Sequence, residues 1–349
     1  MVAVRRGWST ALELDVALEQ SPDIVVRALA YCDLVGTPVM ADRVLLNTTA
    51  LDLDLGTGGY ALVVAIPDRL PPDEPGSGHL VKARYTPLQQ TVLGVDEQES
   101  PHHHLLRDAD DLAGLPVVVA DLHSALPAIV AGLLLDRPRT RVAYVATDGG
   151  ALPLAFSRTV TALREAGWLA GSVTVGQAFG GDLEAVTVHN GLLAARYVLD
   201  AEVVVVAQGP GNLGTGTRWG FSGVAAGEAI NATAALNGRP VASLRVSSAD
   251  QRERHYGISH HSLTAYGRVA LAPADVPVPD LPEAFGATVA SQAEQLGGRH
   301  RLVSIDVRGL LQALETSPVS LSTMGRGLQE DAAAFLAAAA AGRHAATLL

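Results

Sequence analysis

The chain has 349 residues, a formal net charge of −11 and 48% hydrophobic residues. This composition is typical of a globular protein with a large aliphatic core, and chains of this length commonly form two domains. The acidic balance and the lack of a strongly basic cluster argue against a nucleic-acid partner. The one cysteine, Cys32, excludes an intramolecular disulfide and fits a reducing compartment.

Targeting and membrane segments are not indicated by the sequence. The N-terminal stretch MVAVRRGWSTALELD lacks the apolar core of a signal peptide. The alanine-rich segment Ala332–Ala341 is too short for a membrane span and follows two acidic residues. We therefore expect a cytoplasmic protein with no membrane partner, and the sequence leaves homo-oligomerisation open.

Residues 1–70 are predicted to form a small, barrel-like all-β domain without helices. Its expected strands are Ala11–Leu18, Asp23–Tyr31, Arg43–Thr49 and Tyr60–Ile66. Residues 71–114 are predicted to connect this domain to the rest of the chain, because they begin in a segment rich in proline, glycine and acidic residues.

Residues 115–349 alternate between strand-like and helix-like segments, which predicts an α/β domain with a mostly parallel sheet flanked by helices. The expected strands are Pro116–Ala120, Arg141–Ala146, Ser172–Val175, Val203–Ala207, Val241–Val246, Arg268–Leu271 and His300–Ile305. The expected helices are Ser124–Leu135, Pro153–Ala166, Leu183–Tyr197, Ala225–Leu236, Gly309–Leu314 and a C-terminal helix from about Gly327 to His344. Pro273–Pro282 is predicted to be a rigid connector.

Polar residues follow five of the predicted strands. Ligands of an open parallel sheet bind beyond the carboxyl ends of its strands, so these loops predict a cleft along one edge. We select Asp148, Asp182, His260 and His261 as candidate catalytic residues, since carboxylates and imidazoles exchange protons or hold metals. The alternative for Asp148 and Asp182 is a role in capping a helix or closing a turn.

The loop after Val203–Ala207 is unusually dense in glycine and hydroxyl groups. Glycine allows a ligand to approach the main chain closely, and such loops can direct several N–H groups at one anion. The predicted binding residues for a small anionic ligand are Gly209, Gly211, Gly214, Thr215, Gly216 and Thr217.

Two other interpretations of this loop remain. Gly209–Gly214 has the G-x-G-x-x-G spacing of a dinucleotide-binding turn. However, further glycines delay any helix to about Val224, and no acidic residue ends the next predicted strand. The loop could also be purely structural. It contains no lysine of the P-loop type.

The segment Ser259–Ser262 contains adjacent histidines, with Asp250 and His255 nearby. Together with Asp148, Asp182 and His123 from neighbouring loops, these histidines could form a divalent metal site. The alternative is a hydrogen-bonded scaffold, because no fixed metal-binding spacing is present. A Ser–His–Asp triad using Ser124 or Ser157 has no G-x-S-x-G motif to support it.

Several longer phrases point to one family. They are TDGGALP (Thr147–Pro153), TVGQAFGGDLEAV (Thr174–Val186), GPGNLGTGT (Gly209–Thr217) and GISHH (Gly257–His261). The chain resembles, over nearly its whole length, a bacterial family that is described as a domain of unknown function. The resemblance implies one integrated architecture and assigns no activity or cofactor.

These observations predict an enzyme, a hydrolase or group transferase, that acts on a small anionic or phosphorylated metabolite. Redox chemistry is disfavoured because the chain has neither a cysteine pair nor a complete dinucleotide motif. The alternatives are a non-catalytic protein that senses an anion or nucleotide, and an oligomeric scaffold whose β domain binds a partner.

Overall fold

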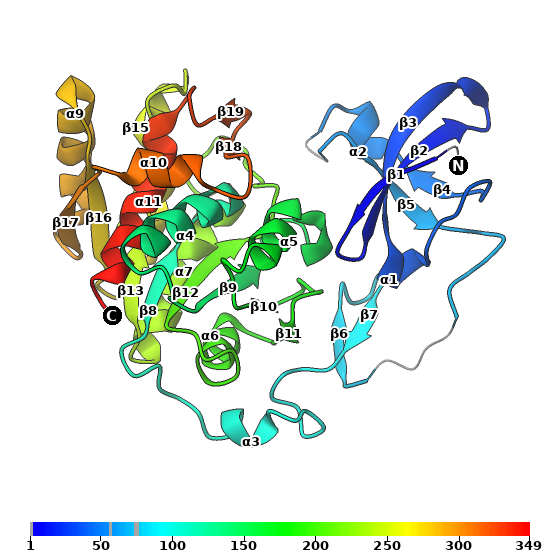
Figure 1. Cartoon of the computed structure of the whole chain (residues 1–349), viewed down its shortest axis with the longest axis horizontal. Coiled ribbons are helices and arrows are strands. Elements are labelled where there is room, and N and C mark those ends of the chain that lie inside the picture. Colours follow the sequence, from blue (N-terminus) through cyan, green and yellow to red (C-terminus); the bar gives the residue numbers. More distant parts are fainter. Residues whose placement is uncertain (1–2, 56–57, 73–76) are drawn as a thin grey trace. The chain divides into compact units, whose positions relative to one another are not determined.

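The computed structural model describes residues 3–55, 58–72 and 77–349. The chain divides into two compact units, each with its own hydrophobic core (Figure 1). Unit 1 comprises Met1–Leu93 and Ala155–Thr161, and unit 2 comprises Gly94–Leu154 and Ala162–Leu349. Residues 73–76 of the predicted connector lie outside the described residues.

Unit 1 is built on a mixed five-stranded sheet with the order β1-β2-β3-β5-β4. Its strands are β1 (Ala3–Trp8), β2 (Ala11–Leu18), β3 (Ser21–Tyr31), β4 (Leu45–Asn47) and β5 (Ala61–Ala65). The predicted barrel is not confirmed, because β1 and β4 are open edges and the described residues form no closed sheet. A separate hairpin pairs β6 (Leu80–Lys82) with β7 (Gln90–Val92).

The expectation that unit 1 lacks helices is wrong. Two single-turn helices are present, α1 (Cys32–Val35) and α2 (Thr49–Asp52). Gly36 ends α1 with a φ of 80°, a conformation that favours glycine. β2 is buried on both faces: Leu14 and Val16 belong to the main core of unit 1, and Ala11 belongs to a second cluster on the opposite face.

Unit 2 contains eight parallel strands in the order β11-β10-β9-β12-β8-β13-β16-β17, which confirms the α/β class. The strands are β8 (Pro116–Val119), β9 (Val142–Thr147), β10 (Gly171–Thr174), β11 (Leu183–Glu184), β12 (Val203–Gln208), β13 (Arg239–Ala242), β16 (Asp275–Asp280) and β17 (Arg301–Asp306). All residues of β8 and β12 are buried, as their unbroken apolar runs predict.

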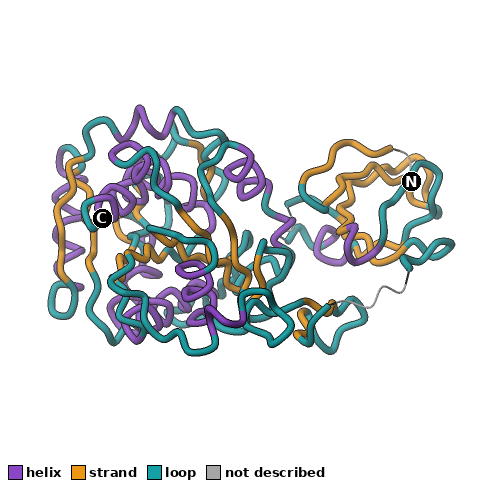
Figure 2. The backbone as a smooth tube through the Cα atoms, turned by 60° about the horizontal axis from the view of Figure 1, so that its bottom comes forward, coloured by secondary structure: helices purple, strands orange, loops and turns teal. Residues whose placement is uncertain are grey.

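Helices cover both faces of the large sheet (Figures 1 and 2). The helices are α3 (His103–Leu106), α4 (Leu126–Asp136), α5 (Arg158–Glu165), α6 (Val188–Tyr197), α7 (Ala225–Ala235), α8 (His260–Thr264), α9 (Glu283–Ala293), α10 (Leu310–Glu315) and α11 (Ala332–Ala346). α4, α10 and α11 pack together, as do α6 and α7. No helix among the described residues is long and apolar enough to cross a membrane.

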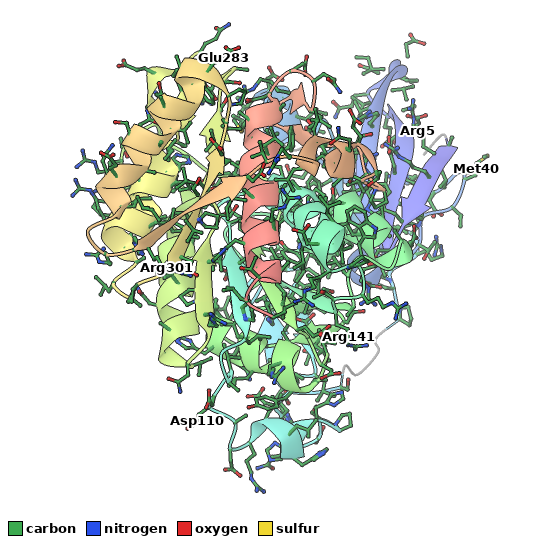
Figure 3. The ribbon with its side chains drawn as sticks, turned by 60° about the vertical axis from the view of Figure 1, so that its left-hand side comes forward. Arg5, Met40, Asp110, Arg141, Glu283 and Arg301 are labelled. Carbon is green, nitrogen blue, oxygen red and sulfur yellow. The ribbon has the colours of Figure 1, made fainter. Side chains whose placement is uncertain are left out.

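The contact between α4 and α11 is unusually close. A Cβ atom on Gly132 would lie 2.0 Å from the Ala339 carbonyl oxygen, and one on Gly342 would lie 1.8 Å from that of Ile129. Figure 3 shows α11 lying along the sheet, near the strand that carries Arg301. His344 of α11 hydrogen-bonds to Asp275 at the start of β16, which ties this helix to the sheet.

The strand predicted at Arg268–Leu271 is wrong, because this segment contains the end of a π-helix, η5 (Ala265–Val269). The strand is instead β16, inside the proline-rich segment that was predicted to be a connector. β16 pairs along its length with β17 but meets β13 only at Asp275. Residues two apart direct their N–H groups to the same side, so Pro277 and Pro279 leave the ladder to β17 intact.

Other boundaries also differ from the prediction. Leu183 and Glu184 form β11, so α6 begins only at Val188. The strand predicted at Val241–Val246 ends at Ala242, and Val246–Ser247 forms β14, which pairs antiparallel with β15 (Gly257–Ile258). The C-terminal helix begins at Ala332, because β18 (Ser322–Thr323) and β19 (Arg326–Gly327) form a hairpin before it. β1 and α9 were not predicted.

Candidate functional site

The strand order of unit 2 brings three loops to one edge of the sheet. β8 lies between β12 and β13. After β8, the chain adds β9, β10 and β11 on one side of β8. After β12, it crosses over β8 and adds β13, β16 and β17 on the other side. Such a change of direction opens a crevice at the carboxyl ends of the central strands. The loops after β8, β12 and β13 are therefore the candidate site.

A cavity of about 130 Å³ lies where the loops after β12 and β13 meet. Its walls combine backbone from the glycine-rich loop with basic side chains. The lining residues are Asn212, Gly214, Gly216, Arg245, Arg252, Arg254, His255, His260, His261 and Met324. We call this the His–Arg cavity. All of its lining belongs to unit 2.

Three histidines stand together in the His–Arg cavity. One ring nitrogen from each of His255, His260 and His261 lies within 4.8 Å of the other two. Ser259 organises them: it caps α8 by accepting the His261 N–H at 3.2 Å, and its Oγ lies 2.7 Å from His255 Nδ1. Ser259 is fully buried, so the protein interior holds its hydroxyl in position for both hydrogen bonds.

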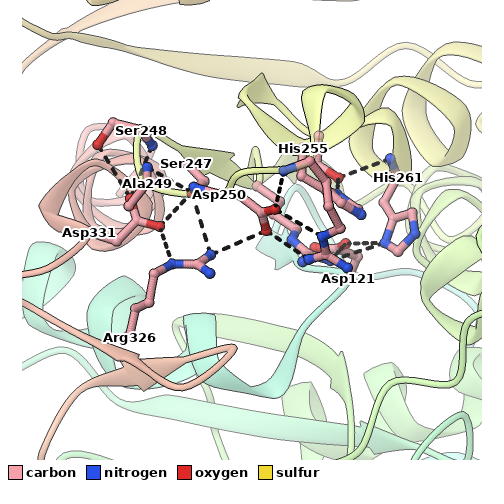
Figure 4. Close-up of polar contacts among 12 residues, drawn as sticks. Asp121, Ser247, Ser248, Ala249, Asp250, His255, His261, Arg326 and Asp331 are labelled. Carbon is pink, nitrogen blue, oxygen red and sulfur yellow. Dashed lines mark hydrogen bonds and ion pairs between the residues drawn. The ribbon is translucent and has the colours of Figure 1, made fainter.

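The ring of His261 is held from three directions. Phe221 stacks on it with a centroid separation of 3.8 Å and an interplanar angle of 1°. Arg245 Nη1 lies 3.1 Å from His261 Nδ1. Asp121 Oδ2, from the loop after β8, lies 3.7 Å from the same nitrogen and 3.9 Å from Arg245 Nη1 (Figure 4). Since a guanidinium only donates, His261 Nδ1 accepts in this arrangement.

Three buried polar atoms at this edge have no hydrogen-bond partner among the described residues. They are Asp121 Oδ2, His260 Nε2 and Gln208 Oε1. Asp121 is 3% exposed, and water does not reach its Oδ2 atom. Buried polar atoms are nearly always paired, and exceptions concentrate where a ligand or ion binds.

A network of ion pairs positions Arg252 and connects it to Arg326. Asp250 binds Arg252 through both carboxylate oxygens, at 2.9 and 2.7 Å. Arg326 bridges Asp250, at 3.3 Å, and the fully buried Asp331, at 3.1 Å (Figure 4). Asp331 also accepts the Ser247 hydroxyl at 2.5 Å. Arg254 forms no ion pair with any described residue.

The protonation of the site follows from burial and from these arginines. Burial, helped by the charge of Arg245, lowers the pKa of His255 to about 3. Burial and the neighbouring His261 and Arg254 lower the pKa of His260 to about 4. Both imidazoles are therefore neutral near pH 7 and can accept a proton or bind a metal ion. Hydrogen bonds from Arg252 keep the pKa of Asp250 far below its ordinary value, so Asp250 is ionised.

The structure places only two of the six predicted anion-binding residues in the His–Arg cavity. Gly214 and Gly216 line the His–Arg cavity, whereas Gly209, Gly211, Thr215 and Thr217 are not part of its lining. Thr215 and Thr217 hydrogen-bond to each other at 3.1 Å. Thr215 N–H also donates to the Gly220 carbonyl, and the loop forms a short hairpin. The helical turn η3 (Ser222–Val224) and α7 follow only after this hairpin, which departs from the dinucleotide motif.

The predicted catalytic residues are also divided. His260 and His261 lie in the cavity, while neither Asp148 nor Asp182 is among the described residues that line it. Asp148 is exposed and accepts the Gln177 N–H at 2.8 Å. Asp182 pairs with Arg164 at 2.7 Å and accepts both the N–H and the hydroxyl of Ser172. Asp182 precedes β11, so it does not cap a helix.

Asp121 and Arg245 are not among the candidate residues predicted from the sequence, and His255 was predicted only as a neighbour of the histidine pair. Asp121 directly follows the buried strand β8, which is a signal that could have identified it. Arg245 and His255 flank the β14–β15 pair, and their convergence depends on that small sheet. Ser259 N–H donates to the Arg245 carbonyl and Arg245 N–H donates to Ser262, which closes the loop around the cavity.

The fold and this cavity define an α/β protein with a histidine- and arginine-lined cavity at the switch point of a parallel sheet. The family described as protein of unknown function (DUF3866) matches residues 27–342, and the chain belongs to this family. Neither the curated proteins nor the solved structures contain a match to this chain.

Proposed function

We propose that the His–Arg cavity binds the anionic group of a small metabolite, a phosphate or a carboxylate. The observation that carries this proposal is the convergence of Arg245, Arg252 and Arg254 on one small cavity of an otherwise acidic protein. Guanidinium groups form short, charge-assisted hydrogen bonds with such anions. Arg254 is the most available of the three, because it lacks a carboxylate partner among the described residues.

The size of the cavity limits what it encloses. Sites for drug-sized ligands typically measure about 300–1,000 Å³. At about 130 Å³, the His–Arg cavity accommodates a phosphate or carboxylate group, and the remainder of the metabolite would lie outside. The exposed residues Leu213 and Trp219 on the same loop offer apolar surface for that remainder.

We further propose that the protein transforms its ligand by hydrolysis or group transfer. Arginines around the anionic group would stabilise the charge that develops during either reaction. The neutral imidazoles beside them provide acid–base groups or metal ligands. Asp148, in the loop after β9 at the same edge, remains a candidate for a group that contacts the rest of a larger substrate. Asp182 was predicted for the same edge, but it lies beside Ser172 near the start of β10. A cytoplasmic location and a homo-oligomeric state are likewise proposals.

Anion binding is tested by titrating the protein with inorganic phosphate and with acetate in a calorimeter. We expect Arg254→Gln to weaken binding at least about tenfold, because it removes a charge-assisted bond. Arg139→Gln is the matched control, since Arg139 is an exposed arginine that does not line the cavity. We expect the control to bind as the wild type does. If neither anion binds at millimolar concentration, the proposal fails.

Turnover is tested with a panel of phosphate and carboxylate esters under the conditions in which the anions bind. Release of product that Arg254→Gln reduces at least tenfold supports an enzyme. Tight anion binding without turnover of any ester would instead support the alternative, a protein that senses an anion without transforming it.

A further inference from the structure

We propose that His255, His260 and His261 bind one divalent transition-metal ion, with zinc as the preferred ion. This inference deepens the proposed function, because it places an ion in the cavity that is proposed to bind the anion. Imidazole nitrogens are the common ligands of Zn²⁺, and three protein ligands with an open position are typical of catalytic zinc sites.

The geometry of the three histidines is close to that of a metal site. Their nearest ring nitrogens lie within 4.8 Å of one another. Nitrogens that share a tetrahedral zinc ion are about 3.3 Å apart, given Zn–N bonds of about 2.0–2.1 Å. Side-chain adjustments that shorten these separations by up to about 1.5 Å would therefore complete the site.

Two of the histidines already present a suitable nitrogen. Nδ1 of His255 is engaged by the Ser259 hydroxyl at 2.7 Å, and if it donates its proton there, Nε2 is free to bind a metal. Nε2 of His260 is buried and has no hydrogen-bond partner among the described residues. A buried nitrogen without a partner is unfavourable in the metal-free protein, and a bound metal would satisfy it.

His261 requires a change of partner, and Asp121 provides it. His261 Nδ1 accepts from Arg245, which places the proton of the neutral ring on Nε2. To bind a metal through Nε2, the ring must carry its proton on Nδ1 instead. Asp121 Oδ2 lies 3.7 Å from Nδ1 and lacks a hydrogen bond, so it is placed to accept that proton. A carboxylate that orients a metal-binding histidine in this way is common.

Carboxylates offset part of the arginine charge beside the histidines, and Arg254 contributes positive charge that no described carboxylate pairs. Arg252 and Arg326 pair with Asp250, and Arg245 lies 3.9 Å from Asp121. The positive charge that remains favours an anion as an additional metal ligand. Metal and phosphate are therefore expected to increase each other's affinity, by the same factor in both directions. Such an ion would also polarise a bound water or ester oxygen.

The experiment measures zinc binding to the full chain after treatment with a chelator, by competition with a chromogenic zinc indicator. We expect one high-affinity ion per chain. His260→Ala should lower the affinity at least 100-fold, and His189→Ala, an exposed histidine on α6, should leave it unchanged within about twofold. Substitution with Co²⁺ should give the visible absorption of a four- or five-coordinate ion, and His260→Ala should abolish it.

Thermal unfolding of the metal-free variants controls for misfolding. A wild-type chain that binds no zinc, or a folded His260→Ala variant that binds it equally well, would overturn the inference. Phosphate titration of the metal-free protein is the separate readout for the proposed function. Phosphate binding without zinc binding would contradict the metal site and leave the anion site, which rests on the arginines. Zinc binding without phosphate binding would do the reverse.

Discussion

Each unit of the molecule buries a cluster of polar groups, and the two clusters differ in how completely they are paired. In unit 1, Glu13 is 2% exposed, and its carboxylate accepts hydrogen bonds from Arg6 at 2.5 Å and from Tyr60 at 3.1 Å. In unit 2, Asp121 is 3% exposed, yet Oδ2 has no hydrogen bond, and its polar neighbours His261 Nδ1 and Arg245 Nη1 lie 3.7 and 3.9 Å away. A paired cluster contributes stability, while an incompletely paired one is maintained at a cost to stability.

This difference separates a structural cluster from one that we propose is held for a ligand. Residues held for function are often destabilising, because their unmet interactions are reserved for a ligand. By this criterion, the Glu13 cluster belongs to the architecture of the small sheet. The Asp121–histidine cluster belongs to the site. The two assignments make opposite predictions for stability and for ligand binding.

In unit 1, the largest effect on stability is expected for Glu13→Ala. The substitution removes the hydrogen bond from the Tyr60 hydroxyl to the Glu13 carboxylate and the packing of the buried Glu13 side chain, at a cost of about 2–3 kcal/mol. The charges of Arg6 and Arg27 contribute less, because both arginines are about half exposed. Urea unfolding, together with hydrogen exchange in β2 and β3, measures the loss.

Glu19→Ala is the matched control for this prediction, because the Glu19 side chain is 87% exposed. It should change stability by no more than about 0.5 kcal/mol. If Glu13→Ala were equally mild, the pairing in unit 1 would not be stabilising and the contrast between the clusters would fail.

A smaller effect is a difference between the two units in how their stability depends on pH. Burial lowers the pKa of His123 in unit 2 to about 4, below its ordinary value of 6.5. A group with a lowered folded-state pKa stabilises the protein above its unfolded pKa, so this contribution is lost as the pH falls from 6.5 to 4. Burial raises the pKa of Glu13, but hydrogen bonds from Arg6 and Tyr60 outweigh it and the net pKa lies below 4.5. Unit 1 should therefore lose stability only below about pH 4.5.

Hydrogen exchange at a series of pH values resolves the two units. Between pH 6.5 and 4.5, unit 2 should lose on the order of 1–2 kcal/mol for His123 and a further loss for His255 and His260, whose pKa values are also lowered, while unit 1 should remain nearly constant. His123→Phe should reduce the response of unit 2 by the share of His123, without abolishing it and without changing the response of unit 1. An unchanged slope in this variant would show that His123 is not among the groups responsible.

The sequence predicted much of the fold but only part of the site. β8 and β12 were predictable because their unbroken valine runs require burial on both faces. β16 was not, since its prolines are tolerated only because pairing with β13 is nearly absent. His260 and His261 were identified from their adjacency. Asp121 joins them only because the crossovers place β8 beside β13, a long-range arrangement that local patterns do not encode.

Among substitutions of the buried carboxylates, the smallest change in stability is expected for Asp121→Asn, although it should affect binding strongly. The substitution removes a buried charge whose second oxygen has no hydrogen bond, so the lost attraction to Arg245 and the relieved desolvation nearly cancel. We expect unfolding free energies within about 1 kcal/mol of the wild type. Zinc affinity should fall about 10–100-fold, because the amide orients His261 less well than the carboxylate does.

Asp331→Asn is the matched control for Asp121→Asn within the same unit. Asp331 is fully buried like Asp121, but it is paired with Arg326 and accepts the Ser247 hydroxyl. Its substitution should cost about 3 kcal/mol, as expected when one partner of a buried ion pair is removed. If Asp121→Asn were as destabilising as Asp331→Asn, its carboxylate would be part of the architecture. Because the two aspartates differ chiefly in pairing, the ratio of stability loss to binding loss at each position distinguishes a structural carboxylate from one held ready for a ligand.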